Sequence, residues 1–365
     1  MRGDDKFLVF SDLHAHTHTR YSSRGRSGNS RLDVALDVLK QMLNHCLAEG
    51  INKVIFAGDL FDAKARVPVR VLNAVSEEIE TWGYFGINVL MIPGNHDYLV
   101  RSGEHHALEV LSVHRNVTIV GRVMLIDWYG LRVKCIPYQE ENDPFIFMAT
   151  EGADILVAHG CAEGMCHIPR ALPEDPGAPD GEWIREEWLR GYKLSIIGHV
   201  HEPEERTRGA AWTIVPGCPY QDNPHFREAQ RGFWEVDWEK KTARMIESKA
   251  ERFIRILIKE GKLEESKDID GNVIRVIPTG RETPLEIRDA VASLYDAGAS
   301  FVEVCKPEVS KDKKPDAPRL QIGEADSVQD VFRRALGSEL FDLKEEDTEA
   351  VLKRGLEILG SIQTK

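Results

Sequence analysis

The 365-residue sequence has no apolar run near the ~20 residues that a membrane-spanning helix requires. Its six cysteines are scattered, which argues against a disulfide framework and for a reduced, cytoplasmic protein. A strand pattern begins almost at the first residue, so no secretory signal peptide is expected. No phosphate-binding loop of the Gly-X-X-X-X-Gly-Lys-Ser/Thr type occurs, so any dependence on ATP must come from a partner.

The sequence also lacks an excess of positive charge, because its formal net charge is −13. Proteins that bind nucleic acid by themselves are usually basic, so this chain is not expected to grip DNA tightly alone. The acidity does not exclude DNA as a substrate. Bound metal ions reverse the local field, and a partner subunit could supply the grip.

Five short apolar runs, each followed by side chains of the kind that bind metals, are the main positive signal. Runs of this length and composition are typical of buried strands, and side chains at the carboxyl ends of such strands converge on one crevice. The runs cover residues 7–10, 54–57, 89–92, 155–158 and 194–197, and the side chains that follow are Asp12, His14, Asp59, Asn95, His159, His199 and His201. Oxygen and imidazole ligands without thiolate suit manganese, zinc or iron. We therefore predict a two-metal site for phosphoester chemistry.

The spacing within the first and last of these blocks predicts how their side chains point. Asp12 and His14 alternate, as do His199 and His201, and alternate residues of an extended strand end lie on the same side. A carboxylate at Asp59 can bridge two metal ions about 3.5–4 Å apart.

A further histidine has a different predicted role. His96 lies between Asn95 and Asp97, where it is placed to protonate a leaving oxygen rather than to bind metal. We expect Asp97 to orient the imidazole ring and to raise its basicity.

The pattern of elements predicts an α/β chain. Helices are expected over 30–49, 68–82 and 103–113, and a hairpin over 122–136. The composition changes near residue 250, and a Lys/Asp/Pro-rich run follows the next strands and helix. The predicted organisation is a catalytic core over 1–250, a small α+β cap module over 251–308, a linker over 309–323 and C-terminal helices over 324–365.

The five blocks together resemble the calcineurin-like metallophosphoesterase superfamily, whose pattern is Asp-X-His, Gly-Asp-X-X-Asp, Gly-Asn-His-Asp, a lone His and Gly-His-X-His. The pattern stands here, in order, as Asp12-Leu13-His14, Gly58-Asp59-Leu60-Phe61-Asp62, Gly94-Asn95-His96-Asp97, His159 and Gly198-His199-Val200-His201. The resemblance covers roughly residues 7–201. It implies a two-sheet β-sandwich flanked by helices, in the layer order α-β-β-α.

The resemblance also implies how the ligands divide. One metal would take Asp12, His14, Asp59 and His201, and the other would take Asp59, Asn95, His159 and His199. The family's reaction is an in-line attack of an activated water on phosphorus, which here would be assisted by His96. Mn²⁺ is the expected ion, with Mg²⁺, Zn²⁺ and Fe²⁺ as alternatives.

Two further segments point to a branch of the family. The block at 58–62 is similar to that of bacterial SbcD-type DNA repair nucleases. Residues 215–219, Asp222 and 231–233 are similar to the recombination nuclease subunits of T-even phages. The resemblance implies a DNA substrate, an SMC-like coiled-coil ATPase that the C-terminal helices would bind, and a homodimer formed through core helices. Eukaryotic members usually carry histidine at the position of Asp62, which leaves the balance of exonuclease and endonuclease activity open.

The first block has a rival explanation. Residues 12–17 also resemble the opening motif of the PHP phosphoesterases, but those proteins lack the blocks at 94–97 and 198–201. His16 is then expected in a loop at the mouth of the site, where it contacts either phosphate or only its own loop. Arg20, in a stretch rich in serine and glycine, suits contact with a phosphate backbone, and a solvated loop is the alternative.

These features allow three functions. The first is a metal-dependent DNA exonuclease and endonuclease subunit of a repair or recombination complex, in the cytoplasm of a bacterial or phage-infected cell. The second is a small-molecule phosphodiesterase, nucleotidase or protein phosphatase of the same fold, against which the cap module and the tail argue. The third, a scaffold without activity, conflicts with a complete ligand set and His96.

Overall fold

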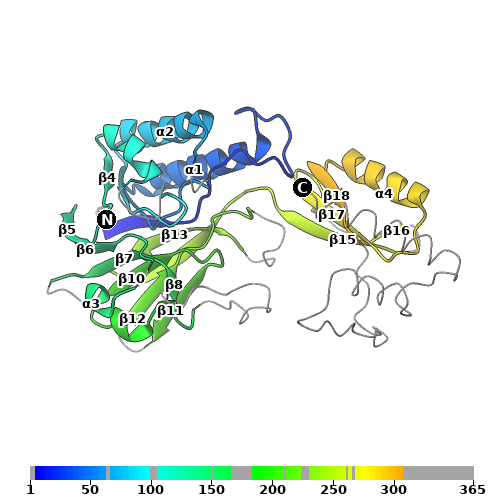
Figure 1. Cartoon of the computed structure of the whole chain (residues 1–365). Coiled ribbons are helices and arrows are strands. Elements are labelled where there is room, and N and C mark those ends of the chain that lie inside the picture. Colours follow the sequence, from blue (N-terminus) through cyan, green and yellow to red (C-terminus); the bar gives the residue numbers. More distant parts are fainter. Residues whose placement is uncertain are drawn as a thin grey trace, which may run out of the picture. The chain divides into compact units, whose positions relative to one another are not determined.

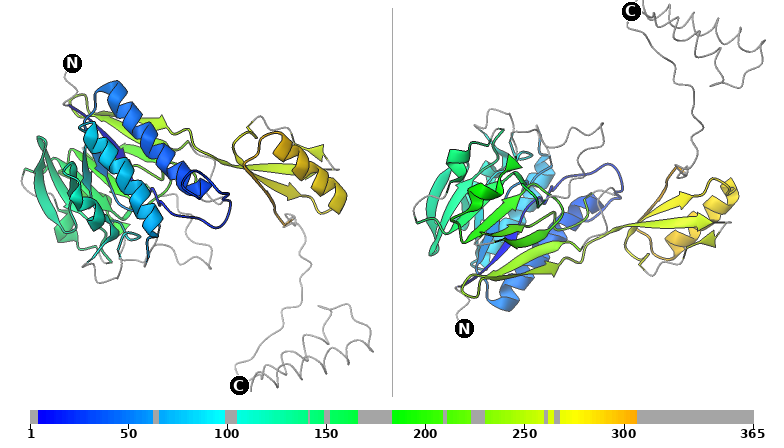
Figure 2. Two further views of the ribbon diagram at one scale, coloured as in Figure 1. Left: turned by 90° about the horizontal axis from the view of Figure 1, so that it is seen from above. Right: turned by 90° about the horizontal axis from the view of Figure 1, so that it is seen from below.

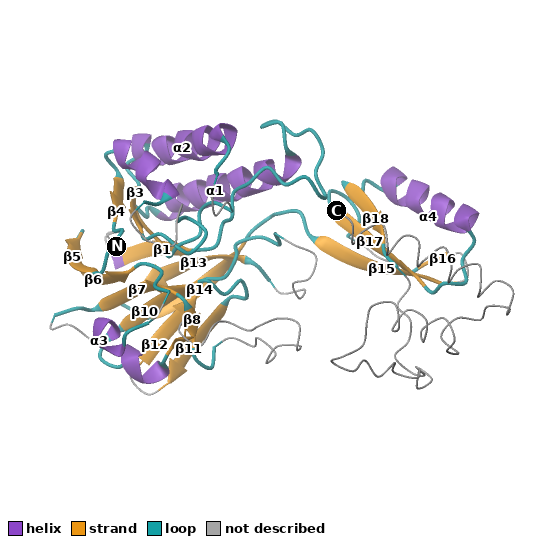
Figure 3. Ribbon diagram, in the orientation of Figure 1, coloured by secondary structure: helices purple, strands orange, loops and turns teal. Residues whose placement is uncertain are grey.

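Two six-stranded sheets form the larger part of the protein (Figures 1 and 3). The computed structural model describes residues 5–62, 66–98, 105–140, 142–148, 152–165, 183–208, 211–222, 230–259, 262–264 and 268–306. In the first sheet the strand order is β14-β13-β1-β2-β3-β4, with β1 to β4 parallel and β13 antiparallel to β1. Its strands are β1 (Lys6–Phe10), β2 (Lys53–Phe56), β3 (Asn88–Met91), β4 (Val117–Ile119), β13 (Gly232–Asp237) and β14 (Thr242–Glu247).

The second sheet has the order β11-β12-β10-β7-β6-β5. Its four central strands are parallel, and an antiparallel strand closes each edge. The strands are β5 (Met124–Trp128), β6 (Leu131–Ile136), β7 (Ile155–His159), β10 (Leu194–Gly198), β11 (Glu204–Arg208) and β12 (Ala211–Val215). A separate pair of short strands, β8 (Cys161–Ala162) and β9 (Trp183–Ile184), lies outside this sheet.

Apolar side chains on both faces of the central strands explain why the sheets are layered. Phe7 and Val9 of β1 belong to a hydrophobic cluster with side chains of the second sheet, such as Val157. Leu8 and Phe10, which alternate with them, pack in a different cluster with the helices. A strand buried on both faces needs an uninterrupted apolar run, which is the pattern that the sequence shows.

Helices cover the two outer faces, so the layers follow the predicted order α-β-β-α (Figure 2). On the first sheet lie α1 (Ser30–Glu49), α2 (Val69–Tyr84) and a 3₁₀ helix (Ala107–Val113), and on the second lie α3 (Pro144–Phe147) and a 3₁₀ helix (Glu186–Leu189). The helix expected over 103–113 is shorter than predicted in the described residues, and it is of the 3₁₀ type. His106 is extended and bridges to Tyr98, so the described helix begins only at Ala107 and is a short 3₁₀ turn.

A second, smaller module follows residue 250. Its sheet has the order β16-β15-β17-β18, and α4 covers one face with a cluster of its own. The elements are β15 (Phe253–Lys259), β16 (Lys262–Leu263), β17 (Val273–Pro278), α4 (Pro284–Asp296) and β18 (Phe301–Val304). The linker and C-terminal helices lie outside the described residues, and the proposed domain boundaries stay predictions. None of the described helices combines the length and the apolar character that a bilayer span requires.

One buried carboxylate joins three elements of the first layer and yields a prediction about stability. Glu235 of β13 accepts hydrogen bonds from Lys6 (2.9 Å) and Arg244 (2.9 Å), and it lies 2.8 Å from the His45 ring nitrogen of α1. Burial alone would raise the pKa of Glu235, but the hydrogen bonds from Arg244, Lys6 and His45 outweigh it and lower the pKa from 4.5 to about 2. The resulting stabilisation is therefore present above pH 4.5 and is lost as the pH falls towards 2.

We predict that Glu235→Gln lowers the free energy of unfolding by about 1–3 kcal/mol at pH 7, because two buried charge-assisted hydrogen bonds are weakened. The difference from wild type should shrink as the pH is lowered through the interval between the two pKa values. Urea denaturation at a series of pH values measures both effects. Glu239→Gln, at an exposed turn residue, is the matched control, and a difference that stays constant with pH would contradict the assignment.

Candidate metal centre

Four of the predicted ligands lie on backbone of a rare conformation. Among the described residues, seven other than glycine have positive φ, and four of these are Asp12 (52°), His14 (49°), Asp59 (62°) and His199 (106°). Side chains seldom adopt this region, and residues held in it are concentrated at functional sites. The expectation that Asp12 and His14 extend a strand is therefore wrong, since β1 ends at Phe10 and both residues follow in left-handed turns.

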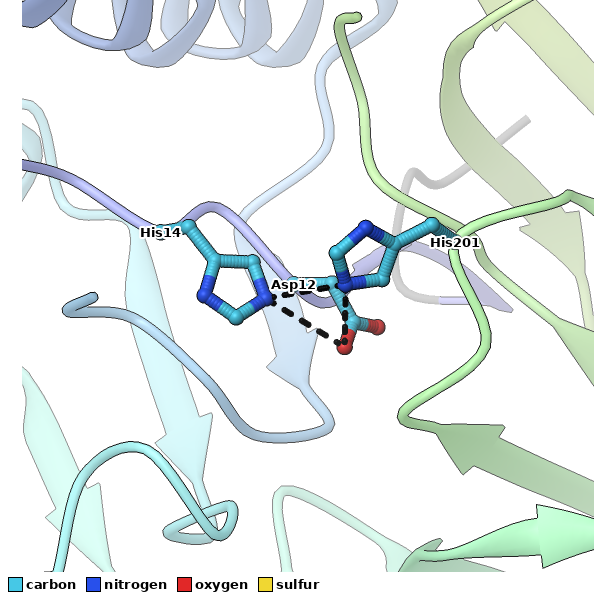
Figure 4. Close-up of side chains that lie close together, drawn as sticks. All are labelled: Asp12, His14 and His201. Atoms are coloured by element: carbon cyan, nitrogen blue, oxygen red, sulfur yellow. Dashed lines mark hydrogen bonds and ion pairs between the residues drawn. The ribbon is translucent and has the colours of Figure 1, made fainter. Parts of the chain in front are cut away.

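The first group of ligands comprises Asp12, His14 and His201, whose side chains point toward one another (Figure 4). The Nε2 atoms of His14 and His201 lie 3.0 Å apart, and each is 3.9 Å from Oδ1 of Asp12. Asp12 and His14 are buried. One carboxylate oxygen and two imidazole nitrogens converging at this separation fit a hard or borderline divalent cation.

The second group comprises Asp59, His159 and His199, with the amide of Asn95 between the two rings. Oδ1 of Asn95 lies 3.0 Å from Nε2 of His159 and 3.1 Å from Nδ1 of His199. Nε2 of His159 is in turn 3.4 Å from Oδ2 of Asp59. These four side chains are the set that the family resemblance implies for the second metal.

Asp59 connects the two groups. Its Oδ2 atom is 3.7 Å from Nε2 of His14 in the first group and 3.4 Å from Nε2 of His159 in the second. A single carboxylate between two imidazoles from different groups is the arrangement that a bridging ligand needs. The donor set therefore fits two divalent cations that share Asp59.

Neighbouring groups fix which nitrogen each ring presents. Nδ1 of His159 lies 2.8 Å from the carbonyl of Ala57, so the ring donates there and its Nε2 lone pair faces the site. Nδ1 of His201 faces Asp222 at 3.6 Å, which leaves Nε2 toward Asp12. Such partners orient metal ligands and raise their basicity.

Asp12 is held from the second sheet as well as from its own. Both of its carboxylate oxygens accept the backbone N–H of His199, at 3.0 and 3.1 Å, and Oδ2 also accepts the Ser11 hydroxyl. These hydrogen bonds hold the Asp12 carboxylate where the two sheets meet.

Asp97 does not contact the His96 ring in the way that the sequence suggested. Its carboxylate accepts backbone N–H groups of four residues, Asp59, Leu60, Phe61 and Gly94. Burial and the charge of Asp59 raise the pKa of Asp97 to about 7, against the effect of these hydrogen bonds. Asp97 thus anchors the loops after β2 and β3, because its side chain turns inward from the loop while His96 turns toward the site.

The carboxylate beside His96 is Asp62. Its Oδ1 lies 3.0 Å from Nδ1 of His96 and 3.9 Å from Nδ1 of His14. The hydrogen bond with His96 is the main reason that the pKa of Asp62 is lowered to about 2. The His96 ring meets the His14 ring edge-on, with centroids 4.7 Å apart.

His16 and Arg20 lie in the loop that follows the first ligand block. The His16 ring packs edge-on against His18, with centroids 5.3 Å apart, and neither belongs to the two ligand groups. The guanidinium of Arg20 is largely exposed, pairs with Glu303 of β18 at 2.7 Å and lies over the Tyr21 ring. A role for either residue with substrate stays a prediction.

Sequence reasoning missed the partners of the ligands. The partners are Asp222 beside His201, which the sequence offers only through the family resemblance, and Ser11 beside Asp12. No sequence pattern predicts either contact. Asp222 reaches His201 through tertiary packing, and Ser11 reaches Asp12 through the conformation of a turn.

Comparison with known proteins identifies the class. Residues 5–218 match the calcineurin-like phosphoesterases, and the chain belongs to this family, whose members use divalent metal ions. Exonuclease subunit 1 of Enterobacteria phage T4 is 24% identical over 330 residues, which are 88% of this chain and 90% of that protein. The expected similarity to a recombination nuclease subunit of a T-even phage is thereby confirmed.

Among solved structures, the chain matches the protein TT1561 of Thermus thermophilus with a TM-score of 0.42 and 14% identity, over 67% of this chain and 98% of that one. A second is described as a novel archaeal phosphodiesterase, with a TM-score of 0.36 and 16% identity over 67% of this chain and 99% of that one.

Metal binding should stabilise the protein through Asp59. Mn²⁺ at 100 times its dissociation constant should raise the free energy of unfolding by about 2.7 kcal/mol. We predict that Asp59→Asn removes most of this gain, because Asp59 touches both groups. Thermal unfolding with Mn²⁺ and with a chelator measures it, and Asp127→Asn on the exposed β5–β6 hairpin is the control. An equal Mn²⁺ effect in both variants would refute the bridging assignment.

Gly94 is needed because no side chain fits at its position. A methyl group there would overlap the Asp59 carboxylate and the His159 ring. We predict that Gly94→Ala weakens Mn²⁺ binding at least tenfold, measured by calorimetric titration. In Gly121→Ala the methyl group meets only the His106 ring, so that variant controls for the cost of crowding. Normal Mn²⁺ binding in a folded Gly94→Ala protein would show that the ligands tolerate displacement.

Proposed function

We propose that this protein is the metal-dependent nuclease subunit of a DNA repair or recombination complex, with exonuclease and endonuclease action on DNA phosphodiesters. The observation that carries the proposal is a complete two-group ligand set with His96 beside it, in a chain similar over most of its length to a phage exonuclease subunit.

The chemistry divides among named residues. Asp12, His14, Asn95, His159, His199 and His201, with Asp59 shared, would hold two divalent ions, with Mn²⁺ as the expected species. Such ions activate water and neutralise charge on a phosphoryl group. His96 donates a proton to the leaving oxygen, and Asp62 orients the ring through Nδ1 so that Nε2 faces the substrate.

The proposal includes partners. Because its net charge is −13, the chain needs a second subunit to bind DNA tightly. We propose an SMC-like coiled-coil ATPase as this subunit. It would dock on the segment after residue 323. A homodimer through core helices is also proposed. Val69 on α2 and Val113 on the 3₁₀ helix are 70% and 76% exposed, so apolar area is available there. The complex would act in the cytoplasm of a bacterial or phage-infected cell.

The test compares two substrates that differ in what the leaving group needs. End-labelled linear double-stranded DNA releases an alkoxide that must be protonated, whereas bis-p-nitrophenyl phosphate releases a stable phenolate. We predict that His96→Ala slows DNA hydrolysis with Mn²⁺ by about 10²–10⁴-fold and slows hydrolysis of the nitrophenyl ester much less. Metal content should be measured in both proteins, because His96 also lies with His14 and Asp62 in a cluster that could hold a metal ion. A role as general acid requires that the metal content stay unchanged in His96→Ala.

His105→Ala, which removes a largely exposed histidine, is the matched control. Equal losses on both substrates would argue against a general acid. A wild-type protein that cleaves the small ester but not DNA, even with its ATPase present, would favour a small-molecule phosphodiesterase instead.

A further inference from the structure

A buried arginine supports the ligands from behind and belongs to neither ligand group. Arg31, near the start of α1, is 1% exposed. Its guanidinium donates to Oε2 of Glu251 (2.8 Å) and to the backbone carbonyls of Gln221 (2.7 Å) and Asp222 (3.1 Å). A buried cation with so many fixed acceptors holds its neighbours in one arrangement, because any movement leaves charge unpaired.

Aromatic rings complete the surroundings of the guanidinium. Its central carbon lies 5.0 Å from the ring centroid of Phe253 and 5.8 Å from that of Tyr220. Tyr220 and Asp222 flank Gln221, so Arg31 contacts three consecutive residues of one segment, which we call the 220–222 segment. The planar fork of arginine, rather than a lysine ammonium, is suited to several acceptors at once.

The 220–222 segment meets the first ligand group at two places. The hydroxyl of Tyr220 donates to the carbonyl of Leu13 (2.8 Å), the residue between Asp12 and His14. Asp222 faces Nδ1 of His201 at 3.6 Å. Both turns that carry the first group therefore contact the segment.

The same arginine is linked to the smaller module. Glu251 precedes β15 and also accepts the Ser300 hydroxyl, just before β18. The side-chain carbonyl of Gln221 accepts the N–H of Phe253, the first residue of β15 (2.8 Å). One guanidinium thus joins the start of the small sheet to the segment that supports the first ligand group.

We propose that Arg31 is a positioning residue for the first metal: through the 220–222 segment it fixes Asp12, His14 and His201, and it ties their geometry to the attachment of the small module. This inference rests on the proposed function only in taking the ligand groups to bind divalent cations. It makes the first group selectively sensitive to a residue that touches no ligand.

The experiment is a Mn²⁺ titration of the full-length protein, followed by calorimetry and by the electron paramagnetic resonance signal of free Mn²⁺. The variants are Arg31→Met and Arg31→Lys. Arg31→Met keeps much of the side-chain volume and removes the positive charge, whereas Arg31→Lys keeps the charge and loses the planar guanidinium with its several donors. We expect one of two Mn²⁺ ions to bind about 10–100-fold more weakly in Arg31→Met and the other to bind as in wild type. Arg31→Lys should give a smaller loss, and Arg132→Met, on the exposed hairpin, should give none.

A second signature separates positioning from general damage. Hydrolysis of bis-p-nitrophenyl phosphate by Arg31→Met should be low at limiting Mn²⁺ and should recover toward wild type when Mn²⁺ is raised. Two normal Mn²⁺ affinities in a folded Arg31→Met protein would overturn the proposal, as would equal weakening of both ions.

Milder variants cover the case in which Arg31→Met does not fold. Tyr220→Phe removes only the hydrogen bond to Leu13, and Asp222→Asn removes only the charge facing His201. Each should weaken the same single ion, and unchanged affinity in both would overturn the proposal. Failure of the proposed function gives a different result, because a wild-type protein that binds two Mn²⁺ ions and cleaves no DNA leaves the Mn²⁺ arms of this experiment intact.

Discussion

The carboxylate of Asp97 is the contact on which the geometry of the site depends. Four backbone N–H groups from two loops converge on it, three from the turn after β2 and one from Gly94 after β3. Without this acceptor, the turn that holds Asp59 at positive φ would leave buried N–H groups without partners. A carboxylate satisfies four donors at once, and an amide at the same place could not, since it offers fewer acceptor sites. Strain at Asp59 is thereby stabilised by hydrogen bonds outside the reacting centre.

The site also brings buried carboxylates together, and bound cations would neutralise their charge. Asp59 and Asp97 are both buried, and burial together with the charge of Asp59 raises the pKa of Asp97. In the chain by itself the His159 imidazole is the main counter-charge to Asp59, and although burial opposes it, Asp59 raises the pKa of His159 to about 9. Burial would raise the pKa of Asp59, but His159 and His14 outweigh burial and lower it. Divalent ions would take over that role and leave the rings neutral, which is the state in which imidazole binds metal.

Much of the site could be predicted because its chemistry is local in sequence. Each ligand follows its strand within a few residues, and strand ends meet at one edge of a sheet, so residues 12, 59, 95, 159 and 199 were expected together. The limits of α1 were equally readable, because its apolar positions repeat at helical spacing and Gly50 ends it in the left-handed region. The sequence does not predict that His96 pairs with Asp62 rather than with Asp97. It depends on which way two adjacent side chains leave a turn, and that is decided by the four N–H groups that capture Asp97. The 3₁₀ helix at Ala107–Val113 likewise follows from a long-range bridge, Tyr98 with His106, that periodicity does not report.

The distribution of ligands between the sheets links metal binding to the core. Asp12, His14, Asp59 and Asn95 follow strands of the first sheet, whereas His159, His199 and His201 end or follow strands of the second. Each ligand group draws on both sheets, so neither exists until the sheets pack through the cluster that contains Val9, Ile55 and Val157. Close-packed side chains set the distance between the sheets. Because a protein interior is dense and hardly compressible, this distance varies little. A cation that binds across this interface must therefore stabilise the packed state over any state in which the sheets separate, because the separated sheets offer it only part of its ligand set.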